Sequence, residues 1–570
     1  MKSQTGAARM VEALQLANVS CVFGLPGTQT VELFEALRKS GLRTVVATNE
    51  LSAAFMAGGW ARMTGHAGVL LTIPGPGFTW ALTGIAEARL DSVPLLHIVA
   101  APAREPTGRR FRQQELDQAA IAVPLVKRVI EADSHSDPGL AVLEGLLIAQ
   151  SGEPGPVLVQ VSSTTLGREF TLPTLDIPSS GRSDPDAMQA VCARVQRARR
   201  PILMVGQGAN GCAQQVRALV ERLKAPLLTT PAGRGVLSES HPFNFGFDPF
   251  AGKIRDINAL LASSDLILVI GCKLGHSGTA GFGLNLPPDR LVHVDANGEV
   301  VGANYPASLG VVADAGDLLD ALLTSSPLPS AWTEEELESW RTRVAVRTAK
   351  GREPRIAGTP EGDARNFFQS LRRVLPADVV LVLDSGLHQI LARRYFRVLE
   401  PRGLLVPTDL QSMGFAIPTA IGARLAVPDR TVVALVGDGG FAMTALELLT
   451  AVRERVSLVV IVFVDGAFGQ IRLQQLTNYG AAHGVSLNNP DFSLLAASVG
   501  ARYELVGDNI ETVVAAALAH SGVTVIEVTV GDSLAMRRTA VVARTREATR
   551  RMVGPRLFRL LKTVLGRKRT

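Results

Sequence analysis

Cysteine is scarce in this chain of 570 residues, and so are aromatic side chains and long apolar runs. The four cysteines lie far apart with no Cys-x-x-Cys pair, which excludes a disulfide scaffold and a zinc ribbon. No eighteen apolar residues follow one another, and the first residues contain no unbroken apolar segment, so the sequence predicts neither a membrane span nor an export signal. We therefore expect a cytoplasmic protein.

What is present is typical of a large globular protein. Hydrophobic residues make up 46% of the chain and charged residues 19%, which excludes disorder, and the 54 glycines do not mark a collagen. A chain of this length is expected to contain several domains, because single cores rarely grow beyond about 250 to 300 residues.

The net charge of +6 belongs to one end of the chain. From Arg544 to Thr570, ten Lys and Arg residues face the single acidic residue Glu547, so this segment carries +9 and the remaining chain carries −3 in sum. No nucleic-acid groove is predicted. Apolar and basic residues recur at helical spacing between 556 and 569, which indicates a short basic amphipathic helix. One hypothesis is weak contact with an anionic membrane surface or an acidic partner, and the alternatives are docking on a neighbouring subunit or disorder.

Short apolar runs rich in β-branched residues alternate with Ala- and Leu-rich stretches of helical period. This alternation predicts βαβ units around buried parallel sheets, and it occurs in three sets. The predicted strands are residues 19–24, 43–48, 67–73, 94–100 and 156–161; 201–206, 226–230, 266–271 and 291–296; and 379–384, 431–439, 458–465 and 524–530. The predicted fold class is α/β, with three doubly wound parallel-sheet domains and a basic C-terminal tail.

Two polar stretches rich in Pro, Ser and Gly divide these sets. Residues 171–186 and 325–359 are therefore predicted to be linkers. The predicted domains are residues 1–170, 186–325 and 359–535, followed by the tail 536–570.

Two acidic residues are predicted at neighbouring strand ends in the third domain. One strand runs into the Gly-rich turn 437–440, which contains Asp438, and the next strand ends at Asp465. At the carboxyl edge of a parallel sheet, such a turn exposes backbone N–H groups to a phosphate, and two carboxylates can hold Mg²⁺. Each feature alone is equally compatible with an ordinary strand-to-helix turn.

In the first domain, Glu50 begins a predicted helix directly after Asn49. A Glu at this position is also compatible with plain helix capping and its favourable interaction with the helix dipole. A Gly-Pro-Gly-Phe-Thr turn at 75–79 follows the next strand.

Taken together, motifs of both domains resemble the thiamine-diphosphate-dependent acetolactate synthase catalytic subunit and its decarboxylase and carboligase relatives. The resemblance spans about residues 1–535. It rests on FGLPGT (23–28), ATNELSAAFMAGGWARMTG (47–65), GPGFT (75–79), TGIAEARLDSVPLL (83–96), QELDQ (114–118), MGFAIPTAIGARLA (413–426), GDGGF (437–441) and VDGAFGQIR (464–472).

The resemblance implies that Glu50 is the catalytic residue and also a cofactor contact. In this family the glutamate bonds the aminopyrimidine ring and favours the imino tautomer that removes the thiazolium proton, while the cofactor acts as the electron sink. The family's site lies between the first domain of one subunit and the third domain of another. A homodimer or homotetramer is therefore expected.

Other roles follow from the same resemblance, position by position. Met413 would force the bent cofactor conformation, and the carbonyl of Gln411 would serve the amino group. Asp438, Asp465 and the carbonyl of Ala467 would hold Mg²⁺. The remaining cofactor contacts would be Pro76, Gly386, His388, Gly439, Gly440 and Phe468, and the substrate contacts would be Pro26, Gln114, Gln470 and Arg472.

The substrate end departs from the family pattern. Ser277 stands where relatives have an Arg that grips the acceptor carboxylate. Residues 242–253 replace the flavin-binding loop, so FAD is not supported by the sequence. Further departures are Trp80 for an Asn, Gln113 for a Phe and Gln474 for a Trp.

These observations predict thiamine diphosphate- and Mg²⁺-dependent decarboxylation of a 2-oxo acid with carboligation, as in acetolactate synthase. Simple decarboxylation of a larger 2-oxo acid is one alternative, and a non-catalytic cofactor-binding regulatory protein is another. The presence of Glu50, Asp438 and Asp465 argues against the regulatory alternative. Without the Arg, pyruvate is expected to be a weak acceptor unless Arg472 or Lys273 compensates.

Overall fold

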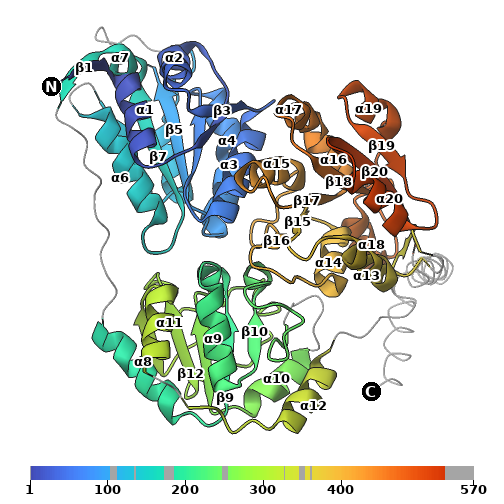
Figure 1. Cartoon of the computed structure of the whole chain (residues 1–570). Helices are drawn as coiled ribbons and strands as arrows, with labels where there is room; N and C mark the ends of the chain where they lie inside the picture. The colour runs from blue at the N-terminus through green and yellow to red at the C-terminus, as the bar shows by residue number, and fades with distance from the viewer. Residues whose placement is uncertain are drawn as a thin grey trace, which may run out of the picture.

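The computed structural model describes residues 2–102, 112–133, 136–172, 185–246, 254–325, 328–345, 353–359 and 362–532. Within these ranges the chain forms three parallel sheets with helices packed against them, which confirms the predicted α/β architecture (Figure 1). Every predicted strand is found. The predicted basic tail lies outside the described residues.

The first sheet is entirely parallel, with the order β3-β2-β4-β5-β7-β6. Its strands are β2 (Cys21–Gly24), β3 (Arg43–Val46), β4 (Gly68–Thr72), β5 (Leu95–Ala101), β6 (Arg128–Ala132) and β7 (Pro156–Ser162). The helices are α1 (Gly6–Leu16), α2 (Val31–Ser40), α3 (Glu50–Thr64), α4 (Pro76–Leu90), α5 (Gln118–Ala122), α6 (Pro138–Gln150) and α7 (Ser163–Gly167). An antiparallel pair, β1 (Lys2–Thr5) and β8 (Glu169–Leu172), ties the ends of the domain together.

The central sheet is also parallel, with the order β10-β9-β11-β12-β13. It contains β9 (Pro201–Val205), β10 (Leu227–Thr229), β11 (Leu266–Ile270), β12 (Leu291–Asp295) and β13 (Leu309–Val312). Its helices are α8 (Pro185–Arg197), α9 (Ala213–Leu223), α10 (Ile254–Ala262), α11 (Ala315–Thr324) and α12 (Glu334–Val344).

The third sheet has the order β14-β20-β18-β17-β15-β16, with β19 also paired to β20 and only β14 antiparallel. Its strands are β14 (Arg355–Ile356), β15 (Val380–Leu383), β16 (Leu404–Leu405), β17 (Val432–Gly437), β18 (Leu458–Val464), β19 (Arg502–Leu505) and β20 (Val523–Gly531). Its helices are α13 (Ala364–Val374), α14 (Leu387–Tyr395), α15 (Ala416–Ala426), α16 (Asp438–Thr444), α17 (Leu448–Arg453), α18 (Gly469–Tyr479), α19 (Phe492–Ser498) and α20 (Ile510–Leu518).

The second predicted linker, residues 325–359, is only partly correct. Helix α12 forms inside it, opened by a capping box in which Thr333 and Glu336 bond each other's backbone N–H. Trp332 and Leu337 are buried in the core of the central domain. The sequence did not indicate this helix because its first turn is acidic and only one of its faces is apolar.

The first and third domains share one hydrophobic cluster, in addition to a cluster that belongs to each domain alone. A single cluster of buried residues draws on both domains, whereas the clusters of the central domain contain residues only from 191 to 344. Helices α3 and α15 meet at its centre (Figure 1). A Cβ at Gly59 would lie 2.2 Å from the carbonyl oxygen of Thr419, and one at Gly422 would lie 2.0 Å from that of Met56. Glycine at both positions therefore lets the two backbones approach closely.

In the described part of the chain, no helix combines the length and the apolarity that a membrane crossing requires.

Candidate active site

A cavity of about 140 Å³ opens at the carboxyl ends of β15, β17 and β18 in the third domain. This is the edge at which parallel sheets bind ligands. Its lining includes nine of the positions assigned from the sequence: Gly386, His388, Met413, Asp438, Gly439, Gly440, Asp465, Ala467 and Phe468, together with the substrate position Gln470. The fold thus gathers residues that are far apart in the sequence.

Two carboxylates dominate the acidic side of this cavity. Asp438 is buried at the start of α16, and its Oδ2 accepts hydrogen bonds from the backbone N–H of Gly466 and the amide of Asn489, each at 2.8 Å. Burial and the charge of Asp438 raise the pKa of Asp465 to about 6. Two carboxylates facing one cavity suit a hard cation, which would relieve their repulsion. Among the described residues, no group of three or more His, Cys, Asp and Glu side chains is placed to hold a metal.

His388 supplies a polar atom without a partner at the same cavity. Its ring is buried and stacks on Phe463 at 5.7 Å, and its Nε2 makes no hydrogen bond with the residues that the structure describes. Burial lowers the pKa of His388 to about 4, so the imidazole is neutral at pH 7. A buried ring nitrogen facing a cavity fits contact with a polar ligand such as a diphosphate.

The segment from Thr408 to Ala416 carries the two positions assigned to the pyrimidine end of the cofactor. Gln411 has a φ of 61°, which explains why a glycine is also suited to this position. Its side-chain amide donates to the carbonyl of Thr408 at 2.7 Å, and its backbone carbonyl is the group that matters for the assigned role. Met413 is the part of this segment that lines the cavity.

Glu50 is the first residue of α3 and is buried. The helix starts here because the side chain of Asn49 accepts a hydrogen bond from the N–H of Ser52 at 2.8 Å. A Cβ at Gly77 would lie 2.7 Å from Oε1 of Glu50, so the glycine makes room for the carboxylate at the start of α4. Pro26, in the loop after β2, and Pro76, the first residue of α4, are both exposed at this same edge of the first sheet.

Gln114 and Gln118 have different environments. Gln114 has a φ of 59°, lies against Gly75, and has a buried Oε1 without a partner. Gln118 was not singled out from the sequence, yet it is fully buried and its Oε1 accepts from the N–H of Gly75 at 3.0 Å. Its amide donates to the carbonyl of Ala100 at 3.2 Å. Gln118 therefore fixes the turn that leads into α4, and its only sequence signal is its place in the QELDQ motif.

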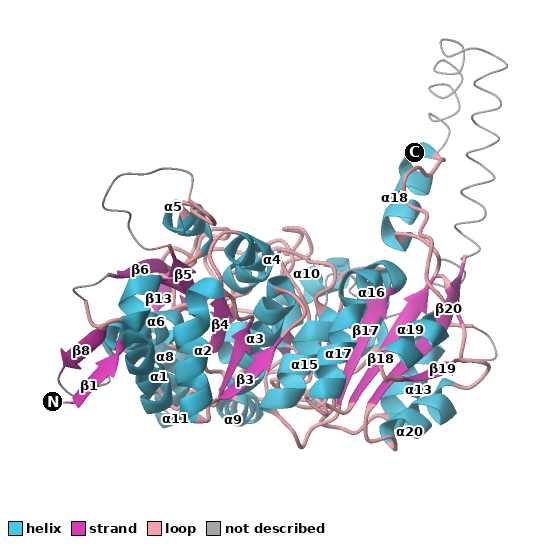
Figure 2. Cartoon of the chain, turned by 90° about the horizontal axis from the view of Figure 1, so that it is seen from above, coloured by secondary structure: helices cyan, strands magenta, loops and turns pink. Residues whose placement is uncertain are grey.

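Arg472 is paired within its own domain. Its guanidinium lies 3.6 Å from Oδ2 of Asp465 and 3.1 Å from Oδ1 of Asp532. It extends from α18, a helix without buried residues that stands away from the body of the molecule in Figure 2. The other candidate cation, Lys273, pairs with Glu153 at 2.8 Å.

The two halves of the assigned site do not meet within one chain. All residues that line the third-domain cavity come from the third domain, and Glu50 is not among them. Two residues before Glu50, the N–H of Thr48 instead donates to buried Glu447 at 3.0 Å. Glu50 in the first domain and the cavity in the third domain are thus separate features of the chain.

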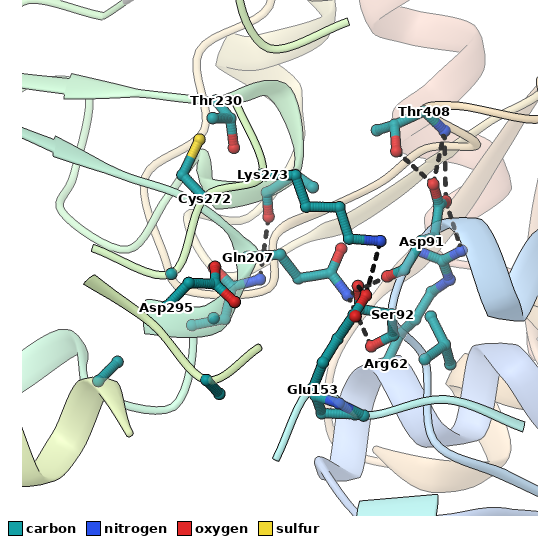
Figure 3. A pocket seen from close by; sticks show the side chains of 18 of the residues that line it. Arg62, Asp91, Ser92, Glu153, Gln207, Thr230, Cys272, Lys273, Asp295 and Thr408 are labelled. Carbon is teal, nitrogen blue, oxygen red and sulfur yellow. Dashed lines mark hydrogen bonds and ion pairs between the residues drawn. The ribbon is translucent and has the colours of Figure 1, made fainter. Parts of the chain in front are cut away.

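A second, larger cavity of about 330 Å³ lies between the three domains. Here Lys273 donates to the carbonyl of Leu90 at 2.7 Å. Figure 3 shows Gln207 extending toward Asp91 and Ser92, and its amide donates to the carbonyls of both. Gln207 and Lys273 follow β9 and β11, where a nucleotide would bind in many α/β domains. Here both are bonded to the first domain, and the prediction about FAD stays a prediction.

Comparison with known proteins shows the family to which the chain belongs. Residues 4–121 match the N-terminal TPP binding domain of thiamine pyrophosphate enzymes, residues 188–322 match their central domain, and residues 384–528 match their C-terminal TPP binding domain. The chain belongs to the thiamine pyrophosphate enzyme family, and thiamine diphosphate is the cofactor that these domains bind.

Individual relatives cover nearly the whole chain. A probable 2-ketoarginine decarboxylase of Pseudomonas aeruginosa is 33% identical over 538 residues, covering 92% of this chain and 94% of the relative. The acetolactate synthase large subunit of Corynebacterium glutamicum is 31% identical over 87% of this chain and 81% of its own. That of Parasynechococcus marenigrum is 30% identical over 87% and 82%. The chain is thus similar both to decarboxylases and to synthases.

Proposed function

We propose that the protein uses thiamine diphosphate and Mg²⁺ to decarboxylate a 2-oxo acid and joins the remaining acyl group to a carbonyl acceptor, as an acetolactate synthase does. The observation that carries this proposal is the pairing of a buried Glu50 on one domain with a cavity that presents Asp438, Asp465 and His388 on another. The similarity to enzymes of both kinds supports catalysis over a purely regulatory role.

In this proposal each group of the chain has a defined task. Asp438, Asp465 and the Ala467 carbonyl hold Mg²⁺, whose charge offsets that of the diphosphate. The N–H groups at the start of α16 and the neutral His388 bond the phosphate oxygens. Glu50 holds a proton at the pyrimidine ring. The bound cofactor supplies the electron sink for decarboxylation.

The proposed active unit is a homodimer. Glu50 is not among the described residues that line the cavity of its own chain, which supports a site completed by a second chain. Met443 of α16, Leu446 of the short 3-10 turn Ala445–Glu447, and Leu449 and Val452 of α17 recur every third residue, and all four are exposed in the single chain. Such an exposed apolar stripe is typical of a surface that a partner covers.

Mixed dimers test this arrangement. Glu50→Gln and Asp438→Ala chains should each be inactive alone, but a hybrid of the two keeps one site with both native groups. Random pairing makes half of the dimers hybrids with one working site of two, so activity should recover to about a quarter of the wild-type value. No recovery in a verified hybrid would mean that Glu50 serves its own chain.

A second candidate is plain decarboxylation of a larger 2-oxo acid with a cationic end. Ser277, in place of the family's Arg, donates to the carbonyl of Thr408 at 2.7 Å, and the neighbouring Asp409 is exposed. This loop therefore presents a hydroxyl and a carboxylate, and the nearby Lys273 is already paired. A carboxylate binds a cation better than it binds a second 2-oxo acid, which agrees with the decarboxylase relative.

A substrate panel distinguishes these functions. Holoenzyme should be incubated with pyruvate, longer apolar 2-oxo acids and 2-ketoarginine, alone and with aldehyde acceptors, while released carbon dioxide and product mass are both recorded. Carbon–carbon bond formation supports the synthase-like function, and an aldehyde as sole product supports the decarboxylase. Acetolactate as the main product at sub-millimolar pyruvate would contradict the expected weak acceptor step. Absence of carbon dioxide from every substrate would contradict both functions.

A further inference from the structure

Buried carboxyl groups of two domains hold the loop 408–416. On the third-domain side is Asp384, which directly follows β15 and is completely buried. Its Oδ1 accepts from the N–H of Ser385 at 2.9 Å and of Gly414 at 3.0 Å, and its Oδ2 accepts from Ala416 at 2.8 Å. Both oxygens of this carboxylate are therefore engaged.

On the first-domain side, the loop is held by α4. Oε2 of buried Glu87 accepts from the N–H of Ser412 at 3.1 Å, whereas its Oε1 has no partner in the described part of the chain. One turn later, Asp91 accepts from the N–H groups of Thr408 and Asp409 and is itself paired with Arg62 at 2.7 Å (Figure 3). A second domain thus fixes a loop that belongs to the third.

These hydrogen bonds are made by residues on either side of Gln411 and Met413, the two positions assigned to the cofactor. The backbone N–H groups of residues 408, 409, 412, 414 and 416 are bonded to carboxylates. Gln411 and Met413 lie between these anchored residues, and Met413 lines the cavity. Anchors on both sides of a residue restrict its position far more than one anchor does, because each bond removes backbone freedom.

We propose that Asp384 and Glu87 are positioning residues that clamp this loop and so set where Gln411 and Met413 stand at the cofactor cavity. The proposal rests on the proposed cofactor role of these two residues. Glu87 acts from a different domain, so the approach of α4 to the third domain becomes part of how the cofactor is held.

The bonding pattern predicts different results for the two amide variants. Asp384→Asn must turn an NH₂ group toward a backbone N–H, because both oxygens of Asp384 are acceptors. Glu87→Gln can keep its carbonyl on Ser412 and turn the NH₂ toward the unpartnered Oε1 position. Glu87→Ala removes the acceptor altogether.

Thiamine diphosphate binding, measured by calorimetric titration with excess Mg²⁺, is the first readout. A buried backbone N–H that loses its acceptor should cost affinity about tenfold, so the dissociation constant should rise at least that much in Asp384→Asn and Glu87→Ala. It should stay near wild type in Glu87→Gln and in Thr83→Ala, an exposed substitution on the same helix. Equal defects in Glu87→Gln and Glu87→Ala, or wild-type affinity in Glu87→Ala, would overturn the proposal.

The near-ultraviolet circular dichroism of the bound cofactor, recorded at saturation, is the second readout. A variant that is merely less stable would give the wild-type spectrum once saturated, whereas displacement of Met413 should change it. An unchanged spectrum in Glu87→Ala would contradict the positioning role. If Asp384→Asn does not fold, the comparison of Glu87→Gln with Glu87→Ala still tests the proposal. Neither readout requires turnover, so failure of the proposed reaction would show separately in the substrate panel.

Discussion

Substitution of Glu50 should reduce turnover without preventing cofactor binding. Its carboxylate is buried beside Gly77, and Gln has nearly the same shape but cannot hold the same proton. Because positioned proton transfer contributes about 10²- to 10⁴-fold, Glu50→Gln should lose at least this much turnover while still binding thiamine diphosphate. Stopped-flow or steady-state release of carbon dioxide measures the loss.

The matched control is Glu32→Gln, which changes an exposed glutamate in the first turn of α2. It should keep wild-type turnover. Near-normal turnover of the Glu50 variant would reject its assignment as the catalytic residue.

Substitution of Asp438 should weaken metal and cofactor binding more than substitution of Asp465. Asp438 is buried and bonded to Gly439, Gly466 and Asn489, so its loss disturbs the turn as well as the ion. Asp438→Ala should abolish cofactor binding, whereas Asp465→Asn keeps an oxygen ligand and should only weaken it. Titration of apoprotein with Mg²⁺ and thiamine diphosphate measures both, and a chelator should release the cofactor from wild type. Two equal and negligible effects would contradict a metal site here.

At the scale of elements, the packing of α3 on α15 should be intolerant of a single methyl group. A Cβ at Gly59 would overlap the carbonyl of Thr419, so Gly59→Ala should lower the free energy of unfolding by about 1 to 3 kcal/mol. Gly58 is its neighbour on the same helix, and no atom lies within 4 Å of a Cβ added there. Gly58→Ala should therefore leave stability unchanged or raise it by up to about 1 kcal/mol. Urea unfolding of the two variants makes the comparison, and equal effects would show that the close approach does not matter.

Most of the strands that sequence reasoning found are buried, and the partly exposed edge strand β3 is the exception. β4, β9, β11 and β17 are apolar runs that any such reading detects, because both of their faces are covered. Among the strands it missed, β6 and β19 are short and partly exposed, so their composition resembles that of loops. Edge strands carry little hydrophobic signal.

The residues of the candidate site likewise fall into those that the sequence identified and those that only the structure showed. Glu50, Asp438 and Asp465 follow strands and lie in motifs, so their positions along the chain were enough to select them. Asp384 and Glu87 act on residues about 30 and 325 positions away, and such hydrogen bonds leave no local pattern. Long-range polar contacts became visible only once the chain was folded.

For the whole molecule, the basic tail is the feature that the enzyme family does not explain. We expect that residues 544–570 attract anionic surfaces, because nine net positive charges accumulate there. The full chain should co-sediment with vesicles containing anionic lipid, and a chain ending at Val542 should not. Neutral vesicles and raised salt are the controls, since screening weakens such attraction. Identical sedimentation of the two chains would count against attachment.

The core shared by the first and third domains has a consequence for folding. Each of these domains has a cluster of its own, but the cluster that they share contains buried residues of both. Neither domain can unfold without exposing that shared cluster, so the two should melt as one cooperative unit. The central domain keeps its own clusters and should melt separately. Calorimetry of the apoprotein should therefore resolve two transitions rather than three. Gly59→Ala should shift only the transition of the paired domains, and Val269→Ala, in the core of the central sheet, should shift only the other. Although it lies in the middle of the sequence, the central domain should thus be the thermodynamically independent part, and the first and third domains should fold as one body.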